Sequence, residues 1–484
     1  RSKVWNGMAA APGKGEEAPS VVEVCSDGTK RLKLTDFGKA AAEKARQKAE
    51  ERAALVSECS ERGEVSLQWK QSGGEKVEEL LEHTTLVDMR YLCDLILFKG
   101  ILPRWQELPE GAKITKDTVW RLQGIMEFLP VMVLSYPWSD PFHPDRMGEM
   151  LRCLFPVFWQ MLGKVDYDQR MYPKELGKFP TVGVMVDYAS LPQVPRTEAE
   201  QALFNQGLSN MHFWYAHPCT TVLCVDAPLN KAVEYSNMKG YYERGWCYLE
   251  KRLSALVKEN EFFLSLGSVA DILAEYDSWA AADKFKKLGD YDDFKTTLAA
   301  GRLPPMSPDS VAKEMRSQIA SGELSFSYAA DAEVVIEMYR KGFIETFRQY
   351  KVYKPDADMV DFSDLGWRDS DAYILADALK FMAENDCAQE GLHFDVGIDG
   401  VAAAAAGALK KGLANDFSPA ARQALLDAAQ QAGVKLHSKF EENDKDSLMW
   451  KTDAEREALR EKRLKKLLDE GHESVVRMYD NRSE

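Results

Sequence analysis

The side chains best suited to chemistry follow three apolar runs of the sequence. Ser135, Tyr136 and Trp138 come after the first run, Asp187 after the second and Asp226 after the third. Aromatic rings can form the wall of a ligand pocket, and a hydroxyl such as that of Ser135 can form its polar floor. These side chains can act together only if the three runs end at one place in the fold.

The three apolar runs predict buried strands of a parallel sheet. They begin at Val131, Val182 and Thr220, and each ends in a loop with Asp, Ser or Pro. Unbroken runs of β-formers are typical of strands covered on both faces. Helix-length patterns at 145–163 and 198–215 separate the runs, and this alternation implies right-handed parallel crossovers. Because ligands of such sheets bind beyond the carboxyl ends of the strands, we expect the polar loops to share one crevice.

The order of these segments resembles that of a TIR (Toll/interleukin-1 receptor-like) domain. In that family a first strand ends in Ser-Tyr or Ser-His, as Leu134-Ser135-Tyr136 does, and a second runs into an acidic loop, as Val186-Asp187 does. An aromatic-x-x-[Ser/Gly]-Trp-Cys-x-x-Glu box comes later, and the segment from Tyr242 to Glu250 matches it. Similar boxes also occur in large protist and algal TIR-like proteins.

The resemblance implies a flavodoxin-like parallel sheet and one possible activity. TIR members of the hydrolase kind cleave the nicotinamide–ribose bond of NAD with the Glu of the box, so Glu250 would be the catalytic carboxylate and NAD a substrate rather than a cofactor. One carboxylate below the ribose can stabilise an oxocarbenium-like state. The following side chains would then line the NAD site: Ser135, Tyr136, Trp138, Asp187, Arg196 and Trp246.

Two departures from the family favour a different role. Hydrolase members commonly carry a basic residue just after the Ser-Tyr pair, and Pro137-Trp138 stands there in this chain. The loop after the second strand contains Pro192 and Pro195, where a mobile loop is usual. Proline restricts the backbone, so this loop suits a fixed binding surface better than a closing lid. Both box residues also have a structural interpretation. Trp246 could be a core side chain, and Glu250 could form an ion pair with Arg244 or Arg252.

Other groups of reactive side chains give weaker predictions. A zinc site is disfavoured because its possible ligands do not converge on one point. A small acid/base group around His143 is better explained as a loop in which Asp145 caps a helix. Ser135 has no His partner at a recognisable spacing and is not expected to be a nucleophile. The possible zinc ligands are His212, His217, Cys219 and Cys224, and the His143 group includes Asp140 and Asp145.

Composition predicts a soluble intracellular protein of several domains. The chain has 484 residues and a net charge of −15, which argues against non-specific nucleic-acid binding. Eight scattered Cys residues without a CxxC pair indicate free thiols in a reducing compartment. No apolar run reaches the roughly 18 residues of a membrane span. We expect a cytoplasmic or organellar protein. Because the chain begins at Arg1 and not at Met, a targeting peptide that has been removed is compatible with the sequence.

The remaining patterns divide the chain into six regions. A weak repeat, with Phe362 and Phe394 at matching places, resembles the longer leucine-rich repeats but lacks their asparagine ladder; two helical hairpins with short strands are the alternative. A further strand is expected at 262–266. The regions are an extension with a hairpin (1–38), a helical region (39–125), the TIR-like α/β domain (126–300), a second helical region (301–354), the repeat-like α/β unit (355–438) and a charged helical tail (439–484).

These expectations leave more than one class of function open. The stiff loop and accessory regions favour an interaction or assembly protein, a scaffold or subunit that binds other chains or itself. The alternative is an NAD hydrolase that uses Glu250. A third possibility is a stable subunit of an organelle or cytoskeletal complex, with its charged ends along its neighbours. The sequence predicts no metal, no resident cofactor and no nucleic-acid partner.

Overall fold

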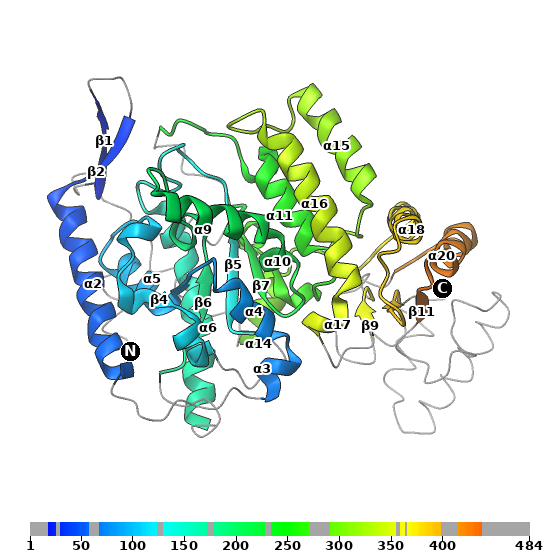
Figure 1. Ribbon diagram of the computed structural model, residues 1–484, viewed down its shortest axis with the longest axis horizontal. Coiled ribbons are helices and arrows are strands. Elements are labelled where there is room, and N and C mark those ends of the chain that lie inside the picture. The colour runs from blue at the N-terminus through cyan, green and yellow to red at the C-terminus, as the bar shows by residue number, and fades with distance from the viewer. Residues whose placement is uncertain are drawn as a thin grey trace, which may run out of the picture. The chain divides into compact units, whose positions relative to one another are not determined.

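The structure is a computed structural model (Figure 1). Its chain forms two compact units, which are described separately. The first comprises Arg1–Gly301, Ala312–Thr346 and Tyr350–Asp356, and the second comprises Arg302–Val311, Phe347–Gln349 and Ala357–Glu484. The structure describes residues 18–25, 30–57, 67–122, 129–171, 179–227, 234–270, 291–354, 359–363, 365–397 and 415–437.

A mixed sheet of six strands forms the centre of the first unit. Its strand order is β4-β3-β6-β5-β7-β8, and the four strands from β6 to β8 are mutually parallel. The expected parallel strands are present, but the expectation that the sheet is parallel is only partly correct, because β3 pairs antiparallel with both β6 and β4 and makes the sheet mixed. The strands are β3 (Leu86–Asp88), β4 (Lys113–Ile114), β5 (Val131–Ser135), β6 (Gly183–Met185), β7 (Thr221–Cys224) and β8 (Phe263–Ser265).

The two antiparallel strands lie in the region expected to be helical, 39–125. β3 has three residues and β4 has two, so neither is long enough to show an alternating pattern. β3 also directly precedes the apolar helix α5 (Met89–Leu97), and the sequence pattern merges the two into one longer helix. The four parallel strands are buried throughout, which explains why apolar runs predicted β5, β6, β7 and β8.

The two faces of the sheet carry different helices. Met132, Leu134 and Leu223 belong to one core with α5 and α6 (Glu149–Met171). Alternate residues point to the other face. There α11 (Gly245–Ser254) lies against β5, and α10 (Met211–Ala216) packs on α11 (Figure 1). The hydroxyl of Tyr215 on α10 donates to the Leu134 carbonyl at 3.1 Å, which ties α10 to the end of β5.

Further elements surround this sheet in the first unit, which includes 312–321 of α15 (Pro308–Ser321) and 331–346 of α16 (Asp331–Arg348); the other residues of these two helices belong to the second unit. The antiparallel pair of β1 and β2 forms the expected hairpin, and α2 buries the alanines Ala41, Ala45 and Ala49 of its otherwise charged surface. The elements are β1 (Ser20–Val24), β2 (Lys30–Leu34), α2 (Asp36–Ser57), α3 (Leu67–Gln71), α4 (Gly74–Leu80), α8 (Asp187–Ser190), α9 (Glu198–Ser209), α14 (Tyr291–Leu298), α15 (Pro308–Ser321), α16 (Asp331–Arg348) and α17 (Tyr350–Tyr353).

The second unit is a small α/β layer. Its three strands are parallel in the order β11-β10-β9, and α18 packs closely on α20. Val360, Phe394 and Leu436 lie in register at the buried centres of the three strands. The elements are β9 (Met359–Asp361), α18 (Asp369–Glu384), β10 (His393–Asp395), α20 (Pro419–Ala432) and β11 (Lys435–His437).

Several sequence-based predictions lie outside the described residues. They are the N-terminal extension up to residue 17, a helix at 271–287, the second helix of the repeat around 408–410 and the charged tail 439–484. Within the described part of the chain, no helix is both long enough and apolar enough to span a membrane.

Candidate functional site

Ser135 and Glu250 meet at the carboxyl edge of the parallel strands. Ser135 is the last residue of β5, and its hydroxyl lies 2.6 Å from a carboxyl oxygen of Glu250 on α11. Ser135 is fully buried, whereas Glu250 keeps some exposure to solvent. The segments expected near the first strand end and the Trp-Cys box thus come together, although 115 positions separate the two residues.

Tyr241 and Cys224 extend this contact to the neighbouring strand. Ser135 and Cys224 are paired in register on parallel strands, so their side chains point to the same face. The Tyr241 hydroxyl lies 2.6 Å from the Ser135 hydroxyl and 3.1 Å from the Cys224 sulfur. We refer to Ser135, Cys224, Tyr241 and Glu250 as the edge cluster.

The sequence reasoning missed Tyr241 because its neighbour fits the motif better. Tyr242 provides the aromatic position of the Trp-Cys box, yet its ring is 62% exposed while that of Tyr241 is 4% exposed. Both residues lie in a single 3-10 turn, in which the Glu243 carboxylate accepts from the Gly240 N–H at 2.7 Å, and their rings meet edge-on with centroids 5.2 Å apart. The Tyr242 hydroxyl donates instead to Asp226 at 2.6 Å. A pair of adjacent tyrosines was the only available signal.

Tyr136, Trp138 and Asp187 form a second polar group at the same edge. Asp187 follows β6, and its two carboxyl oxygens accept from the Tyr136 hydroxyl and from the Trp138 indole N–H, the latter at 3.1 Å. Tyr136 is buried, and Trp138 stacks edge-on against Tyr188 at 5.5 Å between ring centroids. Both aromatic side chains are held by the carboxylate, which fixes their orientation.

Burial raises the pKa of both carboxyl groups. It raises the pKa of Glu250 to about 8, against the hydrogen bond from Ser135, while the nearby charge of Asp187 adds to the increase. Burial also raises the pKa of Asp187, against the hydrogen bonds from Tyr136 and Trp138. The carboxyl of Glu250 is therefore mostly protonated at neutral pH. A protonated carboxyl can donate a proton but supplies little negative charge.

The two remaining residues predicted to bind the substrate have other partners. The Arg196 guanidinium donates to the Pro192 carbonyl at 2.6 Å and stacks on the Phe204 ring at 3.5 Å from its centroid. The Trp246 indole donates to Asp331 at 3.1 Å at the start of α16. These contacts are with structural partners and not with the edge cluster.

The loop after β6 is held along its length. Gln106 donates to the Gln193 carbonyl at 2.5 Å and accepts from the Gln193 N–H at 3.1 Å. The side chain of Thr197 then caps α9 in a reciprocal capping box with Glu200. Between these anchors Val194 is 68% exposed. The loop thus presents an apolar side chain on a fixed backbone.

The start of α11 is covered by the segment between α15 and α16. Gly245 donates its N–H to the Ser325 carbonyl at 3.0 Å, and Ser325 donates its own N–H to Glu243 at 3.0 Å. A side chain at Gly245 would overlap the ring of Phe326. The glycine of the box is therefore required by packing, and the contact fixes the end of the helix that carries Glu250.

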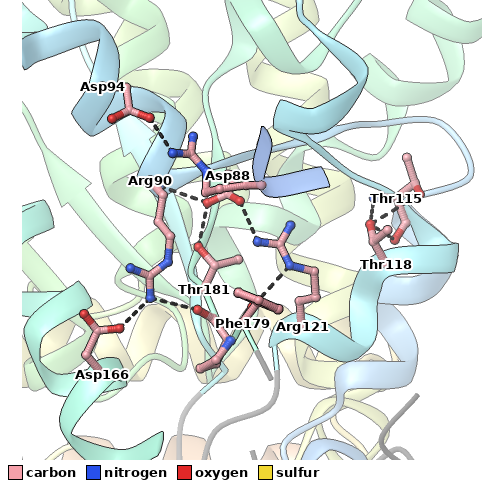
Figure 2. Close-up of polar contacts among 11 residues, drawn as sticks. Asp88, Arg90, Asp94, Thr115, Thr118, Arg121, Asp166, Phe179 and Thr181 are labelled. Carbon is pink, nitrogen blue, oxygen red and sulfur yellow. Dashed lines mark hydrogen bonds and ion pairs between the residues drawn. The ribbon is translucent and has the colours of Figure 1, made fainter. Parts of the chain in front are cut away.

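A separate polar network lies at the opposite edge of the sheet (Figure 2). Asp88 pairs with Gly183 at the start of β6, and it accepts from Thr181 at 2.6 Å and from Arg121 at 2.8 Å. Burial would raise the pKa of Asp88, but Arg121 and the hydrogen bonds outweigh it and hold the pKa below its usual value. Asp88 also caps α5 through the Arg90 N–H. All its partners are structural, so this network positions the strands.

The histidines considered from the sequence also serve structural roles. His143 lies between the Leu102 carbonyl and the Asp145 N–H, and the Asp145 carboxylate accepts from the Glu149 N–H at 2.7 Å at the start of α6. His212 contacts Glu345 at 2.7 Å. Among the described residues, no group of three or more His, Cys, Asp or Glu side chains could hold a metal ion.

The carboxyl edge thus offers a protonated carboxyl, a serine hydroxyl and a carboxylate that orients two aromatic rings. This arrangement can bind a polar ligand and exchange one proton with it. Comparison with known proteins adds no assignment, because no family model, no curated protein and no solved structure matches this chain significantly.

Proposed function

We propose that this chain is an interaction or assembly protein built on a TIR-like, flavodoxin-like domain. The order β6-β5-β7-β8 of the parallel strands supports the flavodoxin-like part, since the first strand of the set lies between the second and the third. The observation that carries the interaction role is the loop after β6. This loop is anchored on both sides and exposes Val194. Because the loop is already ordered, a partner can bind it without the entropic cost of ordering a flexible segment.

The site geometry also supports a non-catalytic role over NAD cleavage. A carboxyl with a pKa of about 8 carries little charge at neutral pH, whereas cleavage through an oxocarbenium-like state needs the negative form. Arg196 and Trp246, which would complete the substrate site, interact with Phe204 and Asp331 instead. The edge cluster then serves mainly to hold α11 on β5.

The partner we propose first is a second copy of the chain, so self-association is the test. Sedimentation velocity over a concentration series should show reversible association of the wild type and its loss in Val194→Asp. Val352→Asp is the matched control, because Val352 on α17 is also exposed, at 57%. A wild type that stays monomeric throughout the series, or equal effects of both variants, would contradict the proposal.

A second function, NAD hydrolysis, is favoured by one observation. Ser135 and Glu250 meet at the edge where parallel sheets bind ligands, with Trp138 and Tyr136 held nearby by Asp187. If Glu250 acts as a carboxylate, nicotinamide release from NAD should rise as pH increases through about 8. Glu250→Gln should abolish it, and the wild type should show no release if the edge is purely structural.

The second unit is proposed to be repeat-like. Its three parallel strands are in one-to-one register, and a helix precedes both β10 and β11. This supports the resemblance to leucine-rich repeats over two helical hairpins alone. Such an α/β layer is a common protein-binding scaffold, which agrees with an assembly role.

A further inference from the structure

The contacts within the edge cluster need more protons than its two hydroxyl groups possess. Three contacts run in series, from Glu250 to Ser135 at 2.6 Å, from Ser135 to Tyr241 at 2.6 Å and from Tyr241 to Cys224 at 3.1 Å. Each contact requires one proton, and the hydroxyls of Ser135 and Tyr241 supply two. The third must come from one end of the series, either the Glu250 carboxyl or the Cys224 thiol.

We propose that the edge cluster is a reversible hydrogen-bond chain whose direction is set by whether Glu250 carries its proton. When Glu250 is protonated, it donates to Ser135, Ser135 to Tyr241 and Tyr241 to Cys224. When Glu250 gives its proton to solvent or to a bound ligand, the Cys224 thiol donates to Tyr241, Tyr241 to Ser135 and Ser135 to the carboxylate. Every other group keeps its own proton and only turns it.

Both directions are chemically available. Burial raises the pKa of the Cys224 thiol to about 12, so this end always retains a proton to donate. A thiol is a weak donor compared with a carboxylic acid, so the chain runs from Glu250 whenever Glu250 is protonated. Ser135, Cys224 and Tyr241 are each at most 4% exposed. Water therefore has little access to replace the contacts between these three.

Other charged and titratable groups face the edge cluster from the elements around it, and none of those in the described part of the protein donates the missing proton to it. Asp187 and Tyr215 act on Glu250, from α8 and α10, while Asp226 and Lys251 act on Cys224. Cys247, on the same helix as Glu250, acts on Tyr241. Asp187 and Tyr215 influence how readily Glu250 ionises, but among the described residues the hydrogen-bonded link from Glu250 to Cys224 passes through Ser135 and Tyr241. Tyr241 is thus a positioning residue: it connects Ser135 to Cys224 and so transmits the protonation state of Glu250 to the thiol.

The test is infrared difference spectroscopy of the full chain as a function of pH. The Cys224 S–H stretch, assigned by its loss in Cys224→Ala, should move to lower wavenumber with the same midpoint as the Glu250 carboxyl band. Tyr241→Phe should leave a titrating carboxyl band and abolish the thiol shift. Tyr242→Phe is the matched control, because it removes the adjacent hydroxyl, which contacts Asp226 instead, and it should behave as wild type.

If Tyr241→Phe does not fold, Ser135→Ala is the alternative variant, because it interrupts the hydrogen-bond chain between Glu250 and Tyr241. It should likewise keep the titrating carboxyl band and abolish the shift of the S–H band. An S–H band that stays fixed while Glu250 titrates, or that still moves in Tyr241→Phe or Ser135→Ala, would overturn the proposal. No assay of assembly or NAD cleavage enters these measurements. If these measurements contradict the reversible hydrogen-bond chain, the proposed function is not affected. If the assays of assembly contradict the proposed function, the hydrogen-bond chain is not affected.

Discussion

At the scale of single residues, the raised pKa of Glu250 has direct consequences for the stability of the fold. Its folded pKa of about 8 lies above the ordinary value of 4.5. Between these two values the folded protein holds a proton that the unfolded chain has released. Stability contributed by this proton is therefore present at low pH and lost as pH rises toward 8.

We predict that Glu250→Gln removes this pH dependence. The variant should be more stable than the wild type near pH 8, by up to about 4 kcal/mol, and the difference should vanish toward pH 4.5. Urea denaturation at a series of pH values measures it. Glu337→Gln is the control, since Glu337 is exposed on α16 and should leave the curve unchanged. A difference in stability between the two proteins that does not grow from pH 4.5 to pH 8 would contradict the raised pKa of Glu250.

Individual site residues were predictable from the sequence only where a strand end dictated their position. Ser135 and Asp187 directly follow buried apolar runs, and parallel pairing brings such ends to one edge. The direction of Arg196 and Trp246 depends on Phe204 and Asp331, whose approach is set by packing between helices. No spacing rule contains that information.

At the scale of elements, α11 depends on a close approach rather than on a capping side chain. Its first residue, Gly245, lies against Phe326, and no side chain caps its N-terminus. The four parallel strands were predictable because they are buried throughout and lie in separate apolar runs. β3 and β4 were not, because β4 has only two residues and β3 runs directly into the apolar helix α5, which dominates the pattern.

Gly245→Ala should destabilise the first unit. The added methyl overlaps the Phe326 ring, and overpacking of this kind costs about 1–3 kcal/mol. Gly163→Ala in α6 is the matched control, because nothing lies near the added Cβ and helix propensity should make it neutral or stabilising by up to about 1 kcal/mol. Chemical denaturation compares the two. Adding Phe326→Leu should recover part of the loss, and equal effects at both glycines would contradict the packing argument.

At the scale of the whole molecule, the second unit depends on one buried asparagine, Asn415, whose role is not evident from the sequence. Asn415, 1% exposed, donates to the carbonyls of Phe362 and Val396 at 2.8 and 3.0 Å and accepts from the N–H groups of Leu365 and Trp367. One side chain thus links the turns that follow β9 and β10. An asparagine ladder requires an asparagine at the same place in each repeat. Asn415 instead occurs once, before α20, so the sequence pattern does not reveal its role.

Asn415→Ala should loosen the second unit specifically. Leaving these buried backbone groups without partners costs about 1–3 kcal/mol for each one that water cannot reach. Hydrogen exchange should show faster exchange of the Trp367 amide and of the strands of this unit, with the central sheet of the first unit unchanged. Asn385→Ala, which removes a single bond to Phe381 at 2.9 Å, should have a much smaller effect. Equal loss of protection in the central sheet would contradict it.

The most direct measurement of the assembly role is hydrogen exchange of the wild type at dilute and at associating concentrations. If the anchored loop after β6 is the interaction surface, amides of Val194 and Arg196 should gain protection on association, while those around Val352 should exchange at the same rate in both conditions. Association that protects other segments and leaves this loop unchanged would contradict the account.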